Sequence, residues 1–157
     1  MKIKIITAIA ENNVIGDGPK IPWYIPEDFK HFKKITLGNV VIMGETTYRS
    51  MGKALPDRYN IVLSFNLKEL PDAAVYNDYE KGLRHAKEYA KKNNCNVFII
   101  GGGSIYKIGM KDADELHISH VPGKFQGNVF FPEFKEEWKP IYEENKEKFM
   151  YRIWVRK

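Results

Sequence analysis

Asp28 is the residue of this chain best placed to do chemistry. It follows Pro26, which suits the first turn of a helix because its missing N–H would have no intrahelical partner there. From Asp28 onward, Phe29, Phe32 and Ile35 recur at spacings of three, so one face of the expected helix is strongly apolar. A carboxylate there either complements the positive end of the helix dipole or faces a pocket, where it binds a cationic or hydrogen-bond-donating ligand.

Two glycine-containing turns suggest a second kind of chemistry. The apolar residues 40–43 end at Gly44, and the apolar residues 97–100 end at three glycines, 101–103. Each is a strand followed by glycine and a helix start with a hydroxyl residue available as N-cap, which is how α/β proteins build anion sites from backbone N–H groups. Either turn alone could be only a flexible or tight connection. Two of them together with an acid on an apolar face are harder to explain by packing.

These side chains need a framework of strands and helices to bring them together. Apolar runs predict strands at residues 2–10, 40–44, 59–63, 97–100 and 116–121. Helical spacing and start signals predict helices from residue 26, over 46–51, over 78–94 with Asp78 as the N-cap, and from residue 104. Strands that alternate with helices imply a mostly parallel, twisted central sheet with helices on both faces.

Two further segments complete the expected framework. In residues 149–155 the apolar side chains alternate with Arg152, which predicts a strand entered through a hairpin turn at 144–148. Residues 11–25 form a loop that is long for a compact domain, a length often found in functional lids. We therefore expect an α/β fold with an antiparallel C-terminal edge strand, in a single domain over residues 1–157.

Composition limits the possible partners and compartments. The net charge of +5 is scattered along the chain, which suits an anionic cofactor and substrate and does not favour nucleic acid. The single cysteine, Cys95, permits no internal disulfide and is consistent with a reducing compartment. No apolar run approaches the ~20 residues that span a bilayer, so we expect a cytoplasmic protein without a membrane partner. Four histidines and one cysteine make no convincing metal set, and we expect no metal.

Over essentially its whole length, the sequence resembles the dihydrofolate reductase family. The resemblance is carried by Ile15-Gly16, Ile21-Pro22-Trp23, residues 26–33, Thr36, residues 41–44, Thr47-Tyr48, Leu55-Pro56, residues 58–64, residues 100–103 and Phe131-Pro132. The spacing of the Ile-Gly pair, the Pro-Trp pair and the acid is specific to that family. It implies NADPH-dependent reduction of 7,8-dihydrofolate to tetrahydrofolate, in support of one-carbon metabolism and thymidylate synthesis, by a monomer that also binds antifolates.

The resemblance implies three residues of the catalytic centre. Asp28 matches the family acid, which can accept two hydrogen bonds from the pterin, and the surrounding apolar walls should raise its pKa. Ser119 matches a hydroxyl position behind the acid, although it could also be only a small strand residue. Trp23 could hydrogen-bond a pocket water or could simply pack under the loop. Because the acid should lie far from the nitrogen that is protonated, we expect water admitted by the loop to donate the proton.

The resemblance also implies two sets of ligand contacts. The substrate contacts expected are Ile6, Ala8, Phe29, Phe32, Met51, Leu55, Ile100 and Arg58. Arg58 matches the arginine that clamps the carboxylate of the glutamate tail, although it could be an ordinary surface arginine. The cofactor contacts expected are Ala8, Ile15, Gly16, Ile21, Gly44, Glu45, Thr46, Thr47, Leu63, Ser64, Phe65, Gly101, Gly102, Gly103, Ser104, Ile105 and Tyr106. Gly101 and Gly102 match a family pair joined by a cis peptide.

Four residues depart from the family pattern. Glu45 reverses the charge of an Arg or Lys that helps to hold the cofactor, and Phe65 and Ser104 stand where relatives often carry polar or basic residues. NADPH stays the expected cofactor, with a reduced preference over NADH. Asn128 replaces an Asp that ties the lid loop in bacterial relatives, and its amide can still accept a hydrogen bond. A related pteridine or pyrimidine reductase, or a binding protein without turnover, are the alternative functions.

Overall fold

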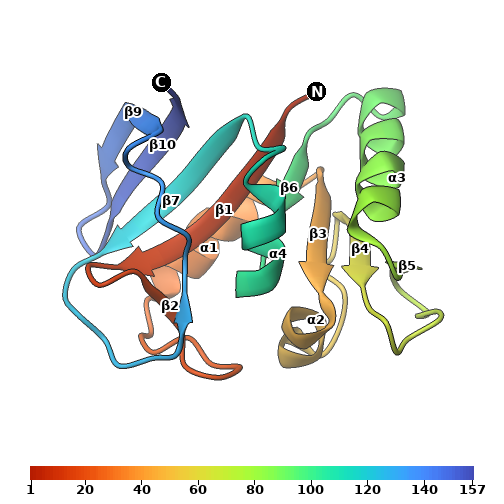
Figure 1. Cartoon of the computed structure of the whole chain (residues 1–157), viewed down its shortest axis with the longest axis horizontal. Coiled ribbons are helices and arrows are strands. Elements are labelled where there is room, and N and C mark those ends of the chain that lie inside the picture. Colours follow the sequence, from red (N-terminus) through yellow and green to blue (C-terminus); the bar gives the residue numbers. More distant parts are fainter.

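An eight-stranded sheet forms the framework of the molecule, and the computed structural model describes all 157 residues (Figure 1). Its strands are β1 (Ile3–Ala10), β3 (Val40–Gly44), β4 (Tyr59–Leu63), β5 (Ala74–Tyr76), β6 (Val97–Ile99), β7 (Glu115–Val121), β9 (Trp138–Asn145) and β10 (Met150–Arg156). Their spatial order is β5-β4-β3-β6-β1-β7-β10-β9. The strands from β5 to β7 are parallel, and β10 and β9 add an antiparallel hairpin.

The central strands are buried on both faces of the sheet. In β3, all four residues from Val40 to Met43 are buried, and the neighbouring strand β6 is buried throughout. Strands covered on both faces read as continuous apolar runs, which is why the sequence shows no alternation here. Successive side chains still point to opposite faces, so Val41 and Ile42 belong to two different core clusters.

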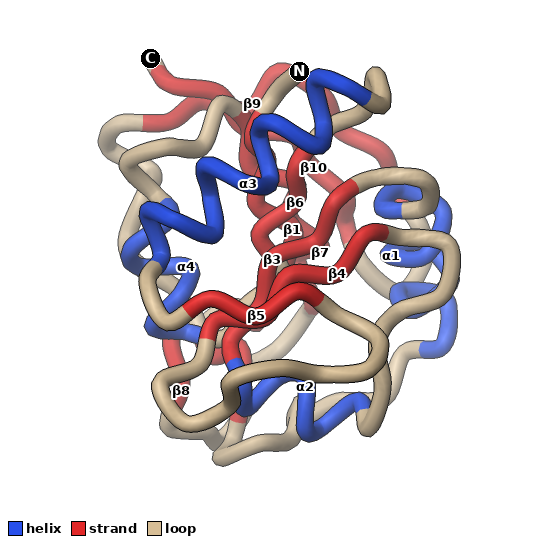
Figure 2. Tube along the Cα trace, turned by 90° about the vertical axis from the view of Figure 1, so that its right-hand side faces the viewer, coloured by secondary structure: helices blue, strands red, loops and turns tan.

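Helices cover the two faces of the sheet. Figure 2 shows α3 (Tyr79–Lys92) and α4 (Gly103–Gly109) on one side and α1 (Pro26–Thr36) on the other. The first side holds the larger cluster, in which Leu83 and Ala86 of α3 pack with Ile42. On the other side, Phe32 and Ile35 of α1 pack against the cluster that contains Val41. None of the four helices combines the length and apolar character needed to cross a bilayer.

The carboxyl ends of the parallel strands meet at one edge of the sheet. The helix α2 (Glu45–Met51) follows β3 directly, and α4 begins shortly after β6. These two strands are neighbours, and the N–H of Gly44 donates to the carbonyl of Gly101 over 2.8 Å. The two glycine turns therefore lie side by side, at the edge where open α/β sheets bind their ligands.

The segment from residue 11 to 25 is fastened to the rest of the molecule. It contains a short strand, β2 (Val14–Gly16), which pairs with β8 (Val129–Phe130) in a separate two-stranded sheet. The sequence predicted this segment only as a loop, because strands of two or three residues carry no periodic pattern. It missed β5 for the same reason.

The structure confirms the α/β fold class and corrects details at the helix starts. The N-caps of α2 and α4 are Gly44 and Gly102, and neither helix has a side-chain cap, so the predicted hydroxyl N-caps are wrong. The glycine takes the extended cap position, which moves the hydroxyl residues into the first turn. Asp78 does precede α3 as the N-cap, but its carboxylate accepts no hydrogen bond from the first turn of the helix.

The C-terminal strand β10 also differs in one respect from the expected alternation. Tyr151 and Ile153 lie in one small cluster with Val121, as the period of two predicts. The register shifts between Ile153 and Trp154, and Trp154 is buried in the larger core. β10 lies between β7 and β9 in the sheet, so both of its edges are paired, and the outermost strand is β9 and not the C-terminal strand that the sequence predicted at the edge.

Candidate active site

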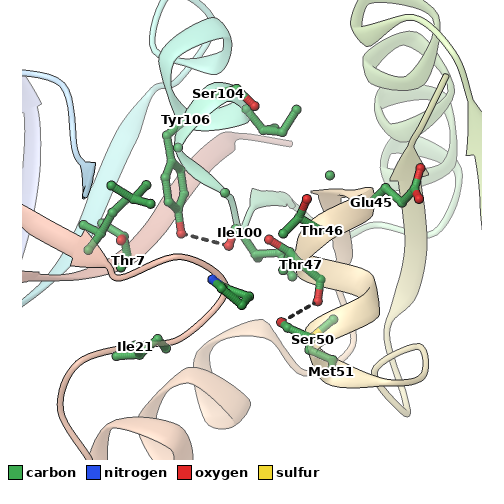
Figure 3. A pocket seen from close by; sticks show the side chains of 18 of the residues that line it. Thr7, Ile21, Glu45, Thr46, Thr47, Ser50, Met51, Ile100, Ser104 and Tyr106 are labelled. Atoms are coloured by element: carbon green, nitrogen blue, oxygen red, sulfur yellow. Dashed lines mark hydrogen bonds between the residues drawn. The ribbon is translucent and has the colours of Figure 1, made fainter. Parts of the chain in front are cut away.

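A cavity with a volume of about 990 Å³ lies at the carboxyl ends of the parallel strands (Figure 3). Its walls come from β1, the 15–23 segment, α1, the turn between β3 and α2, the end of β4, the turn between β6 and α4, and β7. A cavity of this size holds a ligand larger than a single ring system. It is therefore the candidate site for the chemistry that the sequence predicts.

The cavity gathers the predicted site residues from distant parts of the chain. Every residue expected to act in catalysis, substrate binding or cofactor binding lines it, except Gly101. Gly101 instead lies behind the wall and bonds through its carbonyl to Gly44. The peptide bond between Gly101 and Gly102 is cis, as the family resemblance implies.

Asp28 enters the cavity from the first turn of α1. This turn begins at Pro26, and no side chain caps it. The hydroxyl of Ser119 on β7 donates to Oδ1 of Asp28 over 2.7 Å, and the carboxylate makes no other side-chain hydrogen bond within the chain. Burial raises the pKa of Asp28, while the Ser119 hydrogen bond opposes that rise. A desolvated carboxylate that faces a cavity can accept hydrogen bonds from a ligand there.

Large apolar side chains surround this carboxylate. Phe32, Met51 and Leu55 pack against the cluster that contains Ile6 and Ile100. Phe29 lines the cavity but is 49% exposed, so its ring offers apolar surface that a flat ligand could cover. Trp23 also lines the cavity and packs against Phe125 with the ring centroids 5.1 Å apart, so it has both a lining and a packing role.

Arg58 lies in the cavity wall with its guanidinium held in place. Its Nη1 donates to Thr36 Oγ1 over 3.0 Å, and its Nε donates to the carbonyl of Pro56 over 2.9 Å. Thr36 is fully buried at the end of α1, and partial burial lowers the pKa of Arg58. Lys33 of α1 lines the same cavity and adds a second positive charge. This pair can bind a carboxylate.

The two glycine turns supply a different kind of wall. Figure 3 shows Thr46 and Thr47 from α2 and Ser104 from α4 around the cavity. The first turns of these helices have N–H groups without intrahelical partners, which suit an anionic group such as a phosphate. A Cβ at Gly44 would lie 3.2 Å from Ile105 Cγ1, so a side chain there would fit only if Ile105 moved by a few tenths of an ångström. This donor set fits a phosphate-bearing cofactor.

Tyr106 joins the two central strands behind this wall. Its hydroxyl lies 2.8 Å from the carbonyl oxygen of Ile6 and 2.8 Å from that of Ile100, and Figure 3 shows it pointing at Ile100. Burial raises the pKa of the Tyr106 phenol. The hydroxyl is therefore committed to the backbone and positions the strands on which the cavity floor is built.

Glu45 is engaged with neighbours in the chain. One carboxylate oxygen accepts a short hydrogen bond from the hydroxyl of Ser64, and the other accepts from Nε of Arg49 over 2.6 Å. The Ser64 contact, followed by the Arg49 contact, holds the pKa of Glu45 below its usual range. Phe65 follows Ser64 on the cavity rim and is 93% exposed.

Asn128 holds the 11–25 loop, which lines part of the cavity, through two hydrogen bonds. Its side-chain oxygen accepts from the N–H of Gly18 over 2.7 Å, and its own N–H donates to the carbonyl of Gly16 over 3.1 Å. The neutral amide thus accepts the hydrogen bond that the sequence analysis expected of it.

Several cavity residues were missed by the sequence analysis: Thr7, Lys20, Lys33, Ser50, Asn66 and Asn77. Lys33 follows Phe29 by four residues, so helical periodicity could have placed it on the same face. Asn66 and Asn77 lie in irregular segments, where no periodic pattern points to them. No group of three or more His, Cys, Asp or Glu side chains is arranged to hold a metal ion.

Comparisons with known proteins match this chain to one protein family. The family model described as Dihydrofolate reductase matches residues 2–155. The dihydrofolate reductase of Haemophilus influenzae is 34% identical over 145 residues, covering 92% of this chain and 88% of that protein. The dihydrofolate reductase of Buchnera aphidicola subsp. Schizaphis graminum is 40% identical over 145 residues, covering 90% of this chain and 87% of that protein.

A solved structure gives the same result for the fold. The dihydrofolate reductase from Enterococcus faecalis, complexed with NADP(H) and RAB-propyl, superposes with a TM-score of 0.86 at 30% sequence identity. The match covers 99% of this chain and 96% of that one. This chain therefore belongs to the dihydrofolate reductase family, whose members are NADPH-dependent oxidoreductases.

Proposed function

We propose that this cavity reduces 7,8-dihydrofolate to 5,6,7,8-tetrahydrofolate with NADPH, and that Asp28 binds and orients the pterin ring. The observation that carries the assignment is a single desolvated carboxylate that faces an apolar cavity and is held from behind by Ser119. One carboxylate can accept two parallel hydrogen bonds from an amino group and a ring N–H. That fit decides which face of the ring meets the cofactor.

The apolar walls give this contact its strength. Phe29 and Phe32 of α1 lie on the same apolar helix face as Asp28, and Ile100 lines the cavity directly after β6. Exclusion of water from such a site strengthens every electrostatic interaction inside it. The remaining predicted substrate contacts, Ile6, Ala8, Met51 and Leu55, complete the apolar surface.

NADPH supplies the hydride when it is bound. We assign its phosphates to the helix starts at Thr46, Thr47, Gly103 and Ser104, because these residues line the cavity at helix N-termini. Ala8 of β1, Gly102 of the turn before α4 and Tyr106 of α4 line the cavity, where they would hold the reacting end of the cofactor beside the substrate.

The proton needs a separate source. The Tyr106 hydroxyl is committed to backbone carbonyls and its pKa is raised, so it is a poor acid. Asp28 accepts hydrogen bonds from the pterin in this account and does not reach the nitrogen that is protonated. We therefore assign the proton to a water molecule that enters when the 11–25 loop opens.

Arg58 and Lys33 provide the site for the glutamate tail of the substrate. Thr36 and Pro56 fix the guanidinium of Arg58, so its free N–H groups point in a set direction. A fixed guanidinium can bind a carboxylate through two parallel hydrogen bonds. This assignment separates recognition of the tail from recognition of the ring.

The decisive assay follows the loss of NADPH absorbance on addition of dihydrofolate. We expect loss that depends on both compounds. Binding of dihydrofolate and NADPH without turnover would instead identify a binding protein, and turnover of other pteridines or pyrimidines in preference to dihydrofolate would identify a related reductase.

We further propose that residues 1–157 act as one dihydrofolate reductase-like domain, in a cytoplasmic monomer that binds antifolates and has no nucleic-acid or membrane partner. The scattered positive charge and the single cysteine, Cys95, support this proposal. Light scattering of the purified protein measures the oligomeric state, and a dimer would contradict the proposal.

A further inference from the structure

The carboxylate of Glu45 lies in the corner of the cavity between the ends of β3 and β4. Gly44 and Leu63 are register partners at the ends of these strands, so the next residues, Glu45 and Ser64, lie side by side. Glu45 accepts hydrogen bonds from Ser64 on one oxygen and from Arg49 on the other. Its side chain is 20% exposed and lines the cavity.

Ser64 has no remaining capacity to bind another anion. A serine hydroxyl has one donor and two acceptor positions. The donor serves Glu45, and the oxygen accepts the N–H groups of Asn66 over 3.1 Å and of Leu67 over 2.9 Å. Arg49 is the only arginine that contacts Glu45, and its Nε is paired with the carboxylate. A phosphate entering this corner would therefore have to displace Glu45 from Ser64, and at Arg49 it would meet a guanidinium whose charge Glu45 already neutralises.

The order of the strands places this corner at the far end of the cavity from Asp28. Ser119, which holds Asp28, lies on β7, and Ser64 follows β4. In the order β4-β3-β6-β1-β7, four strand spacings separate them, or roughly 19 Å at ~4.8 Å per spacing. A dinucleotide whose reacting ring meets the substrate near Asp28 would extend along this edge and reach the corner with its adenosine end.

Phe65 supports the same placement. It is 93% exposed on the cavity rim, directly after Ser64. A flat apolar side chain at that position offers a surface on which an adenine base can stack. The ribose attached to such a base would then face Glu45 and Ser64.

We propose that Glu45 makes this enzyme a dual-cofactor reductase, by accepting a hydrogen bond from the free ribose 2′-hydroxyl of NADH and competing with the 2′-phosphate of NADPH for Ser64 and Arg49. This inference rests on the proposed function. In dinucleotide sites generally, an acid beside the ribose favours NADH, and an arginine there accommodates the phosphate. Here both residues are present, and the acid neutralises the arginine. NADPH is still bound, with a kcat/KM advantage over NADH of no more than about tenfold.

The test compares Glu45→Gln with the wild type. We measure kcat/KM for NADPH and NADH, and we measure by calorimetry the Kd of adenosine 2′,5′-bisphosphate and of adenosine 5′-monophosphate, which report the corner without turnover. Glu45→Gln should widen the NADPH preference about tenfold, or ~1.4 kcal/mol, and tighten bisphosphate binding by a similar factor. Glu45→Arg should widen the preference at least as much.

Two further variants separate charge from position. Glu69→Gln removes an equal charge from an exposed residue of the loop that follows Ser64, outside the cavity, and it should leave the cofactor ratio and the bisphosphate Kd unchanged. Arg49→Gln combined with Glu45→Gln should cancel the gain in bisphosphate binding, because Arg49 is the cation that Glu45 engages.

The outcomes distinguish this inference from the proposed function. An active enzyme whose cofactor ratio and bisphosphate Kd are unchanged by Glu45→Gln and by Glu45→Arg would overturn the inference and leave the proposed reaction intact. A wild-type NADPH preference of a hundredfold or more would also overturn it. No turnover of dihydrofolate by the wild type with either cofactor would refute the proposed function.

Discussion

The hydroxyl of Ser119 donates to Oδ1 of Asp28 over 2.7 Å, and this bond joins β7 to the first turn of α1. The two residues are 91 positions apart in the sequence. The bond fixes one oxygen of the carboxylate and leaves the other free of intramolecular side-chain partners. It also lowers the pKa of Asp28 against the larger effect of burial, which raises it. Ser119 is thus a positioning residue that acts through Asp28.

Ser119→Ala should raise the pKa of Asp28 further. The variant removes the hydrogen bond that stabilises the charged form and keeps the burial that destabilises it. The titration of the Asp28 side-chain carboxyl carbon, followed by NMR, measures the change. Ser104 lines the same cavity without contacting Asp28, so Ser104→Ala serves as the control. An Asp28 pKa that stays the same or falls in Ser119→Ala would show that the bond does not stabilise the carboxylate.

Asp28→Asn should stabilise the fold at neutral pH. The folded pKa of Asp28 lies above its ordinary value of 3.8, so the folded state binds this proton more tightly than the unfolded chain does. The free energy of unfolding is therefore lowered by the buried charge of Asp28 as pH rises through the folded pKa. Below the pKa of the unfolded chain, this destabilisation disappears. Thermal unfolding should give the variant a higher Tm at pH 7.5, with a smaller difference at pH 4.

Glu27→Gln is the matched control, since Glu27 is an exposed acid in the same helical turn and does not line the cavity. Its Tm difference from the wild type should be small at both pH values. If Asp28→Asn were the less stable protein at pH 7.5, the carboxylate would be contributing stability, and the account of its burial would be wrong.

Arg58→Leu should raise KM for dihydrofolate far more than for a pterin that lacks the glutamate tail. Only the tailed substrate presents a carboxylate to Arg58, and a hydrogen bond between charged groups contributes about 1.5–3 kcal/mol. Steady-state rates with the two substrates give the ratio. Arg84→Leu, an exposed arginine change on α3, should affect neither KM. Equal increases for both substrates in Arg58→Leu would indicate a structural role.

Thr36→Val tests whether orientation of the guanidinium matters. The variant keeps the charge of Arg58 and removes the oxygen that accepts from its Nη1 over 3.0 Å. We expect a selective rise in KM for the tailed substrate that is smaller than the rise in Arg58→Leu. A wild-type KM in a folded Thr36→Val variant would mean that Pro56 alone orients the guanidinium.

Asn128→Ala should loosen the loop over the cavity. It removes the acceptor for the N–H of Gly18, at a cost of roughly 0.5–1.5 kcal/mol, or about two- to tenfold faster amide exchange at Gly18. Asn128→Asp should slow that exchange below the wild-type rate, because a charged acceptor makes the stronger hydrogen bond. Hydrogen exchange followed by NMR measures both. Exchange at Gly18 that is the same in all three proteins would show that β2 and β8 alone hold the loop.

The sequence predicted the elements whose apolar pattern is long. The strands at Ile3–Ala10 and Val40–Gly44 and the helix at Tyr79–Lys92 carry enough apolar residues to define a period or a continuous run. The strands β2, β5 and β8 have only two or three residues, and their pairing depends on tertiary contacts. For the same reason, the pairing of β2 with β8 could not be read in advance, although the resemblance implied that Asn128 contacts the 11–25 loop.

The candidate site was predicted largely through the family resemblance, which also implied the raised pKa of Asp28 and the hydroxyl of Ser119 behind it, whereas the contacts of Glu45 were not predicted. The ion pair between Glu45 and Arg49 follows helical spacing of four, so the sequence contains a signal for it. The bond from Ser64 to Glu45 joins residues 19 positions apart and depends on the register of β3 with β4. A one-residue shift in that register would move Ser64 to the other face.

The most direct test of the central claim is the NADPH-dependent rate of dihydrofolate reduction by Asp28→Asn at neutral pH, compared with the wild type and Glu27→Gln. The amide is nearly isosteric with the carboxylate, but it is uncharged and has only one acceptor atom, so its NH₂ group would face one of the two parallel pterin donors. We predict that kcat falls about a hundredfold or more, or ~2.7 kcal/mol, while Glu27→Gln keeps the wild-type rate. A folded Asp28→Asn variant within about threefold of the wild type, or ~0.65 kcal/mol, would contradict the role assigned to Asp28.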